Sequence, residues 1–319
     1  MYFQRAARTD KGVSAIRQIV SLKLRESVVN NIDEINKLLP SDIRLMGYKR
    51  VTASFDAKNF CDNRTYSYLM PSYALCPISE LTTENYRVPS SVVEEFNSIL
   101  KGYVGVHSFH NFTSGKSFKE DSSTRIIRYM ECSPPFFPCN QNEVEFVLVR
   151  IKGQSFMLHQ IRKMIGLAIA IAKGFATKEH LKKSMEEPYM DIPKAPGLGL
   201  MLEEVHFDRY NRKYGGDGSH EPIEWQAQNK LIELFKEEQI YPVVVQTEIK
   251  EKSLLNWMKT LALHTYGETD DDPELKLHQR IAREIDSKAL DVSGEDNTDD
   301  HDVKRQKLDN IETSERQCV

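Results

Sequence analysis

The stretch Ala7-Arg8-Thr9-Asp10-Lys11-Gly12-Val13-Ser14-Ala15 places one carboxylate between an arginine and a glycine, on a short loop that leads into a β-patterned run. A carboxylate in such a position can be a nucleophile, or a base whose charge is controlled by its neighbours. The same residues fit a type I turn in which Asp10 and Gly12 serve the backbone alone. The local pattern by itself favours the turn, so the choice depends on the other segments.

Outward from this stretch, short segments with period-two alternation are interrupted by amphipathic helical segments. Strands are predicted over 15–24, 43–52, 64–70, 125–132, 143–152 and 200–207. Helices are predicted over 30–39, 89–103, 155–173, 178–187, 221–238 and 252–261, with a rigid loop over 193–199. Hairpin-like turns between strands, with long helices among them, argue for the α+β class with a mostly antiparallel sheet.

Charge is divided unevenly along the 319 residues, whose formal net charge is −4. Residues 1–213 hold 30 Lys and Arg against 23 Asp and Glu, a balance of +7, and residues 214–319 hold 13 against 24, a balance of −11. A mildly basic body with an acidic tail suits a protein that binds nucleic acid while the tail stays clear of the ligand. It equally suits an ordinary globular protein with a solubilising tail.

Cysteine usage and hydropathy exclude several classes of protein. The five cysteines are scattered and form no C-x-x-C pair, so we expect neither a disulfide framework nor a bound metal. The longest apolar run, Met164 to Ala172, is flanked by Lys163 and Lys173 and is too short to cross a bilayer. We therefore expect no association with a membrane.

Two further segments fit the chemistry of a site around Asp10. Arg162 lies one turn beyond His159 on an otherwise apolar helix, where an unpaired guanidinium would be costly. Its anion could be a surface partner, or it could be Asp10, which the pair would keep ionised. Tyr66 and Tyr68 share one face of a strand, where they could pack across strands or form an aromatic platform for a base taken out of its stack.

The segments Arg8-Thr9-Asp10-Lys11-Gly12-Val13, Arg64-Thr65-Tyr66-x-Tyr68 and Phe156-x-x-His159-Gln160-Ile161-Arg162-Lys163-Met164-Ile165-Gly166, in this order, resemble the tRNA pseudouridine synthase A family. Residues 193–200 (PKAPGLGL) and 221–225 (EPIEW) are similar to its eukaryotic branch, tRNA pseudouridine synthase 1. The resemblance covers roughly residues 2–261.

The resemblance implies a two-lobed pseudouridine synthase fold, in which the lobes share a mostly antiparallel sheet flanked by helices. It divides the chain into an N-terminal lobe over 1–75 with the Asp10 loop, a C-terminal lobe over 76–213 and a helical extension over 214–263. The acidic remainder, 264–319, has too few apolar residues to fold and is expected to be disordered.

The resemblance also implies a reaction. Members of the family break the N1–C1′ bond of uridine in RNA, turn the base and rejoin it through C5, with no cofactor. Asp10 matches the catalytic aspartate, which acts as nucleophile on the sugar or as base on the 2′-proton. Tyr66 matches the tyrosine that stacks on the base and Arg162 the arginine paired with the aspartate. The match extends to an arginine that stabilises the extruded nucleotide (Arg8) and an apolar residue near the pocket (Leu200).

Partners and location follow from the same resemblance. We expect a monomer that acts on tRNA, with messenger and other RNA as further candidates, in the nucleus and the mitochondrion. Family members carry a strand and a helix ahead of the aspartate motif, so we expect an N-terminally truncated form. The alternatives are a non-catalytic RNA-binding fragment and a carboxylate-dependent hydrolase.

Overall fold

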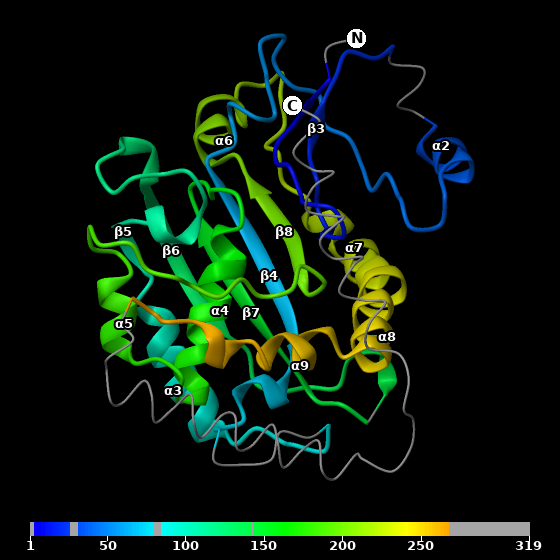
Figure 1. Cartoon of the computed structure of the whole chain (residues 1–319). Coiled ribbons are helices and arrows are strands. Elements are labelled where there is room, and N and C mark those ends of the chain that lie inside the picture. Colours follow the sequence, from blue (N-terminus) through cyan, green and yellow to red (C-terminus); the bar gives the residue numbers. More distant parts are fainter. Residues whose placement is uncertain (1–2, 26–30, 79–83, 142, 268–319) are drawn as a thin grey trace, which may run out of the picture. The chain divides into compact units, whose positions relative to one another are not determined.

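The described part of the chain is built on a six-stranded sheet in the order β2-β8-β4-β7-β6-β5, of which the last five strands are labelled in Figure 1. The computed structural model describes residues 3–25, 31–78, 84–141 and 143–267. β2 runs parallel to β8 and the other neighbouring strands are antiparallel, which confirms the α+β class with a mostly antiparallel sheet. The strands are β2 (Ser14–Ala15), β4 (Asn63–Pro71), β5 (Gly105–Ser108), β6 (Thr124–Cys132), β7 (Phe146–Gly153) and β8 (Leu200–His206), and a separate pair is formed by β1 (Gln4–Arg5) and β3 (Val20–Ser21).

The helices fall into a group between the strands and a group after the last strand. The first group is α2 (Ile32–Leu38), α3 (Ser90–Lys101), α4 (Gln160–Lys173) and α5 (Lys178–Lys183). The second is α6 (Asp208–Tyr214), α7 (Asn229–Phe235), α8 (Tyr241–Glu251) and α9 (Ser253–Met258), with a π-helical turn (Lys236–Ile240) joining α7 to α8. Within the described ranges, no helix has the length and apolar content to cross a membrane.

The two faces of the sheet carry different side chains, because side chains alternate along a strand. On β4, Tyr66 and Tyr68 share one face, where the Tyr68 hydroxyl donates to the Pro196 carbonyl at 2.8 Å. The main apolar core contains fully buried rings from α3, β7 and the segment between them, and the Tyr103 hydroxyl donates to the Met164 carbonyl of α4. The face with the tyrosines is therefore the one that α4 and the loop over 193–199 cover.

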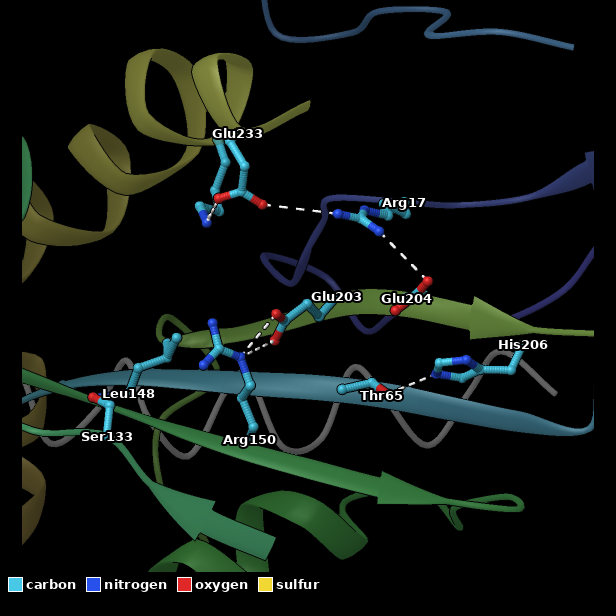
Figure 2. Close-up of polar contacts among 10 residues, drawn as sticks. Arg17, Thr65, Ser133, Leu148, Arg150, Glu203, Glu204, His206 and Glu233 are labelled. Atoms are coloured by element: carbon cyan, nitrogen blue, oxygen red, sulfur yellow. Dashed lines mark hydrogen bonds and ion pairs between the residues drawn. The ribbon is translucent and has the colours of Figure 1, made fainter. Parts of the chain in front are cut away.

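The other face carries a layer of ion pairs beneath α7 (Figure 2). Arg150 of β7 pairs with Glu203 of β8 at 2.9 Å. Arg17, which follows β2, pairs with Glu204 at 3.4 Å and with Glu233 of α7 at 3.8 Å. The layer thus links the segment after Asp10, the strand β8 and the first helix of the C-terminal extension.

Two predicted strands are wrong, because side chains take over the backbone bonding there. The segment 15–24 is not one strand but the short β2 and β3, and between them Gln18 bonds both the N–H and the carbonyl of Ala7 through its amide. The segment 43–52 contains no strand. The Leu45 N–H and carbonyl bond the Asn36 side chain, and the Thr52 N–H donates to the Tyr210 hydroxyl.

Two predicted helices have different limits. The helix predicted over 155–173 begins at Gln160, because His159 has a left-handed backbone with φ 64°. The helix predicted over 221–238 begins at Asn229 and continues through Glu251. Pro242 lies in the first turn of α8, and the π-helical turn before it accommodates the missing N–H.

The remaining predicted elements are confirmed to within a few residues, whereas β1, β5 and α6 were not predicted. The folded region continues past the boundary predicted at 263, since Tyr266 is 1% exposed and His264 pairs with Asp191 at 2.7 Å. The rest of the predicted acidic tail, 268–319, lies outside the described residues. The proposed division into two lobes stays a prediction.

Candidate active site

All five predicted site residues line one cavity of about 900 Å³. Arg8 and Asp10 come from the loop after β1, and Tyr66 from the middle of β4. Arg162 belongs to the first turn of α4, and Leu200 is the first residue of β8. Sequence segments nearly 200 positions apart therefore meet at one place, as the ordered motifs require.

The Asp10 loop is a turn and a part of the cavity at once. The Val13 N–H donates to the Asp10 carbonyl at 3.1 Å, and Gly12 has φ +81° at the third position of the turn. A positive φ there, with Lys11 in the ordinary region, defines a type II turn and not the type I turn considered from the sequence. The turn leads directly into β2, whose pairing with β8 fixes the loop at the edge of the sheet.

The aromatic ring of Tyr66 lines the cavity and is packed against Phe156. It is 8% exposed, and the Phe156 ring packs edge-on against it with centroids 5.3 Å apart. Burial raises the pKa of its phenol to about 12, against the opposing effect of the Arg64 guanidinium. The phenol is therefore neutral at physiological pH, and Tyr66 offers a flat uncharged surface.

Arg64 connects the strand of Tyr66 to the loop of Asp10. Its guanidinium donates to the Ala6 carbonyl through Nη2 at 2.7 Å and Nε at 3.2 Å, and to the Gln154 carbonyl at 3.1 Å. The chain just before Asp10 and the chain just before Phe156 are thus held by one side chain.

The expected ion pair between Asp10 and Arg162 is not formed, since no nitrogen of Arg162 lies within 4.0 Å of that carboxylate among the described contacts. The Arg162 Nε donates instead to the Ala195 carbonyl at 2.7 Å. The loop over 193–199 passes so close to α4 that a Cβ on Gly197 would lie 3.7 Å from the Arg162 Cζ. The guanidinium lies against that loop and reaches the cavity as a separate cation.

The group that does approach Asp10 is His159, to which the sequence analysis assigned no role. Its Nε2 lies 4.0 Å from the Asp10 Oδ2. Partial burial and the charges of Lys194 and Arg162 lower the pKa of His159, against the raising effect of Asp10. The one signal in the sequence was its place three residues before Arg162 in the third motif.

The cavity can attract a polyanion and present one carboxylate to it. Asp10 is its only acidic lining residue in the described part of the chain, whereas its basic lining residues are Arg5, Arg8, Lys58, Arg64 and Arg162. Such a lining favours phosphates through charge-assisted hydrogen bonds. Across the same described residues, no three His, Cys, Asp or Glu side chains are grouped so that they could hold a metal ion.

Comparison with known proteins yields a family and several relatives. Residues 99–208 match the model of the tRNA pseudouridine synthase family, a range that holds Arg162 and Leu200 and follows Asp10 and Tyr66. The chain is 48% identical over 270 residues to the pseudouridylate synthase 1 homolog of Mus musculus, covering 84% of this chain and 63% of that protein. The Homo sapiens homolog is 47% identical, with 84% and 62% covered.

A fungal relative is more distant. The tRNA pseudouridine synthase 1 of Saccharomyces cerevisiae is 30% identical over 288 residues, covering 66% of this chain and 53% of that protein. The chain therefore spans less than two thirds of the length of these relatives. Since nearly half of 270 aligned residues are identical in the mammalian homologs, the chain belongs to the tRNA pseudouridine synthase family, in the branch of pseudouridylate synthase 1.

Proposed function

We propose that this chain converts uridine to pseudouridine in tRNA. The observation that carries the proposal is the cavity that joins the carboxylate of Asp10, the ring of Tyr66 and a set of cations. The Saccharomyces cerevisiae relative, which is named a tRNA pseudouridine synthase, supports the same reaction. The reaction is an isomerisation that consumes no co-substrate: the N1–C1′ bond breaks, a C5–C1′ bond forms, C5 loses a proton and N1 gains one.

Each step has a candidate group in the cavity. The uridine must leave its stack before any side chain can reach C1′, at a cost of about a few kcal/mol. Tyr66 offers the surface on which the extruded base can stack, and Arg8 and the other cations can hold the flanking phosphates. Asp10 then acts on the sugar, as nucleophile at C1′ or as base at the 2′-carbon, and Leu200 closes the apolar side.

Arg162 takes a different role in this proposal from the one inferred from its motif. Its Nε is bonded to Ala195, so its contribution is a fixed positive potential at the cavity and not a direct clamp on Asp10. A preorganised charge of this kind needs no rearrangement during the reaction.

The test is conversion of uridine in a tRNA transcript, read by release of tritium from C5-labelled uridine and by chromatography of the digested RNA. We expect turnover by the natural chain and a loss of more than about 10²-fold in Asp10→Asn, because the amide can neither attack nor take a proton. Asp217→Asn is the matched control, since Asp217 is an exposed carboxylate paired with His220.

The alternatives predict other outcomes in the same experiment. RNA binding without product, in the natural chain and in Asp10→Asn alike, would support the non-catalytic RNA-binding protein. Shortened RNA would support the hydrolase. Action on messenger or other RNA, a monomeric state and residence in the nucleus and the mitochondrion are further proposals from the family resemblance.

A further inference from the structure

We propose that His159 is the base that removes the C5 proton of the rotated uracil. The inference rests on the proposed function and adds a residue that acts after the new C–C bond has formed. It follows from the position of the His159 ring beside Asp10 and from the chemistry of the other side chains in the cavity.

A base is required whichever role Asp10 has. When C5 bonds to C1′, C5 still carries its hydrogen and the ring has lost its C5=C6 double bond. The C5–H bond must then break: its electron pair restores the C5=C6 bond, the C6=N1 pair moves to N1, and N1 takes a proton from water or from the protonated base. The net reaction moves one proton from C5 to N1 and needs no oxidant or reductant.

The geometry places His159 where this proton is released. Asp10 acts on C1′ or on the adjacent 2′-carbon, and C5 is one bond from C1′ in the rotated intermediate. A group close to the Asp10 carboxylate is therefore close to C5, and the His159 Nε2 lies 4.0 Å from the Asp10 Oδ2. The two groups therefore face the same part of the cavity, and His159 lies within reach of a proton released beside Asp10.

Few other groups in the cavity can accept a proton. The arginine and lysine side chains that line it offer donors only. The Tyr66 phenol has a pKa raised to about 12 by burial, so it holds its own proton. A neutral imidazole has one free ring nitrogen. Partial burial and the facing charges of Lys194, Arg162 and Lys163 lower the pKa of His159, against the raising effect of Asp10, and so favour that neutral form.

The backbone supplies an independent observation. His159 has φ 64° and ψ −3°, a left-handed conformation that is uncommon for a non-glycine residue, although histidine adopts it more often than most. Among the described non-glycine residues with positive φ, only His159 lines the cavity. The conformation directs the residue out of the helical path just before α4, and Gln160 fixes it by accepting the Met157 N–H at 2.9 Å.

The test variant is His159→Asn, because asparagine tolerates a left-handed backbone and has no basic nitrogen. We expect turnover on uridine tRNA to fall by about 10²-fold. Proton removal should then limit the rate of His159→Asn. With this variant, tRNA deuterated at C5 of uridine should therefore react more slowly than ordinary tRNA. The matched control is His220→Asn, which removes a second histidine paired with an aspartate, outside the cavity.

A second substrate separates base removal from the earlier steps. Fluorine cannot leave C5 as a cation, so tRNA containing 5-fluorouridine proceeds through C–C bond formation and needs no base. We expect His159→Asn to form this rearranged fluorinated product at the rate of the natural chain. Free imidazole should restore turnover on uridine tRNA by His159→Gly, because removal of the histidine ring leaves space for the added imidazole.

Three results would overturn the inference, and they are distinguishable. Normal turnover without an isotope effect in His159→Asn contradicts the role of His159 and leaves the proposed function intact. Equal loss on uridine and 5-fluorouridine tRNA places His159 before the C–C step and also contradicts it. No reaction of the natural chain on either substrate contradicts the proposed function and this inference together.

Discussion

Tyr66 is suited to stacking on a base and not to proton transfer. Its ring faces the cavity and is held edge-on by Phe156, while burial keeps its hydroxyl protonated with a pKa raised to about 12. The useful property of Tyr66 is then the orientation of its ring. That orientation depends on Phe156, which belongs to the irregular segment between β7 and α4.

Phe156→Leu tests whether the orientation of the Tyr66 ring matters. Leucine keeps apolar volume and removes the edge-to-face contact, which is worth about 0.5–1.5 kcal/mol in aromatic pairs. We expect kcat/KM on tRNA to fall by about three- to tenfold and the melting temperature to fall by about 1–6 °C. Phe118→Leu is the control, because Phe118 makes a similar ring contact with His110 away from the cavity. An equal loss in both variants would show a general effect on folding.

The sequence was enough to predict residues that line one cavity, but not the contacts that their side chains make. Motif order was enough to bring Asp10, Tyr66, Arg162 and Leu200 to one cavity. The direction of the Arg162 guanidinium depends on the carbonyl of Ala195, 33 positions away, on a loop without regular structure. No local pattern encodes such a contact, and the left-handed backbone of His159 has no residue signature either.

At the scale of elements, the loop over 193–199 fastens α4 to β4. The Leu69 N–H donates to the Gly199 carbonyl at 2.9 Å, and the Ala195 N–H donates to the Arg162 carbonyl at 3.1 Å. The approach is so close that a Cβ on Gly166 would lie 2.1 Å from the Pro193 carbonyl oxygen. The loop therefore determines how far α4, and with it Arg162, stands from the sheet.

Gly166→Ala tests this close approach. The added methyl group overlaps backbone atoms that cannot rotate away, so α4 and the loop must separate. We expect a loss of about 1–3 kcal/mol in the free energy of unfolding, measured by chemical denaturation. Turnover should fall by a larger fraction than the free energy of unfolding does. Gly216→Ala should change neither quantity, since nothing lies within 4 Å of its added Cβ. Unchanged stability of Gly166→Ala would contradict the packing described.

Element prediction succeeded where periodicity reflects burial and failed where side chains bond the backbone. The strand β4 and the helices α3 and α4 have long apolar patterns and were predicted to within five residues. The segment 43–52 has a similar local pattern, but Asn36 and Tyr210 bond its backbone in place of a neighbouring strand. Propensity cannot reveal that competition, because both partners lie outside the segment and Tyr210 is 158 positions from Thr52.

At the scale of the whole molecule, the C-terminal extension is anchored beside the end of β4 by a buried carboxylate. Glu248 of α8 is 4% exposed, and its Oε1 accepts both the Tyr73 hydroxyl at 3.1 Å and the Leu254 N–H at 2.9 Å. One oxygen thus joins the segment after β4, the helix α8 and the start of α9. Burial raises the pKa of Glu248, so ionisation of this anchor opposes folding.

Glu248→Gln should therefore change the pH dependence of stability. The folded protein binds a proton at Glu248 more readily than the unfolded chain does, so the natural chain loses stability as pH rises through that raised pKa. An amide oxygen can accept both hydrogen bonds without a charge. We expect the free energy of unfolding of Glu248→Gln to match that of the natural chain at acidic pH and to exceed it by about 1 kcal/mol above the raised pKa, in denaturation series across pH.

Glu248→Ala, which leaves the Tyr73 hydroxyl and the Leu254 N–H without their acceptor, should be less stable than the natural chain by about 1–3 kcal/mol at every pH. Glu238→Gln, at an exposed glutamate in the same helical segment, is the control, and a pH-independent difference between Glu248→Gln and the natural chain would contradict the role of the buried carboxylate.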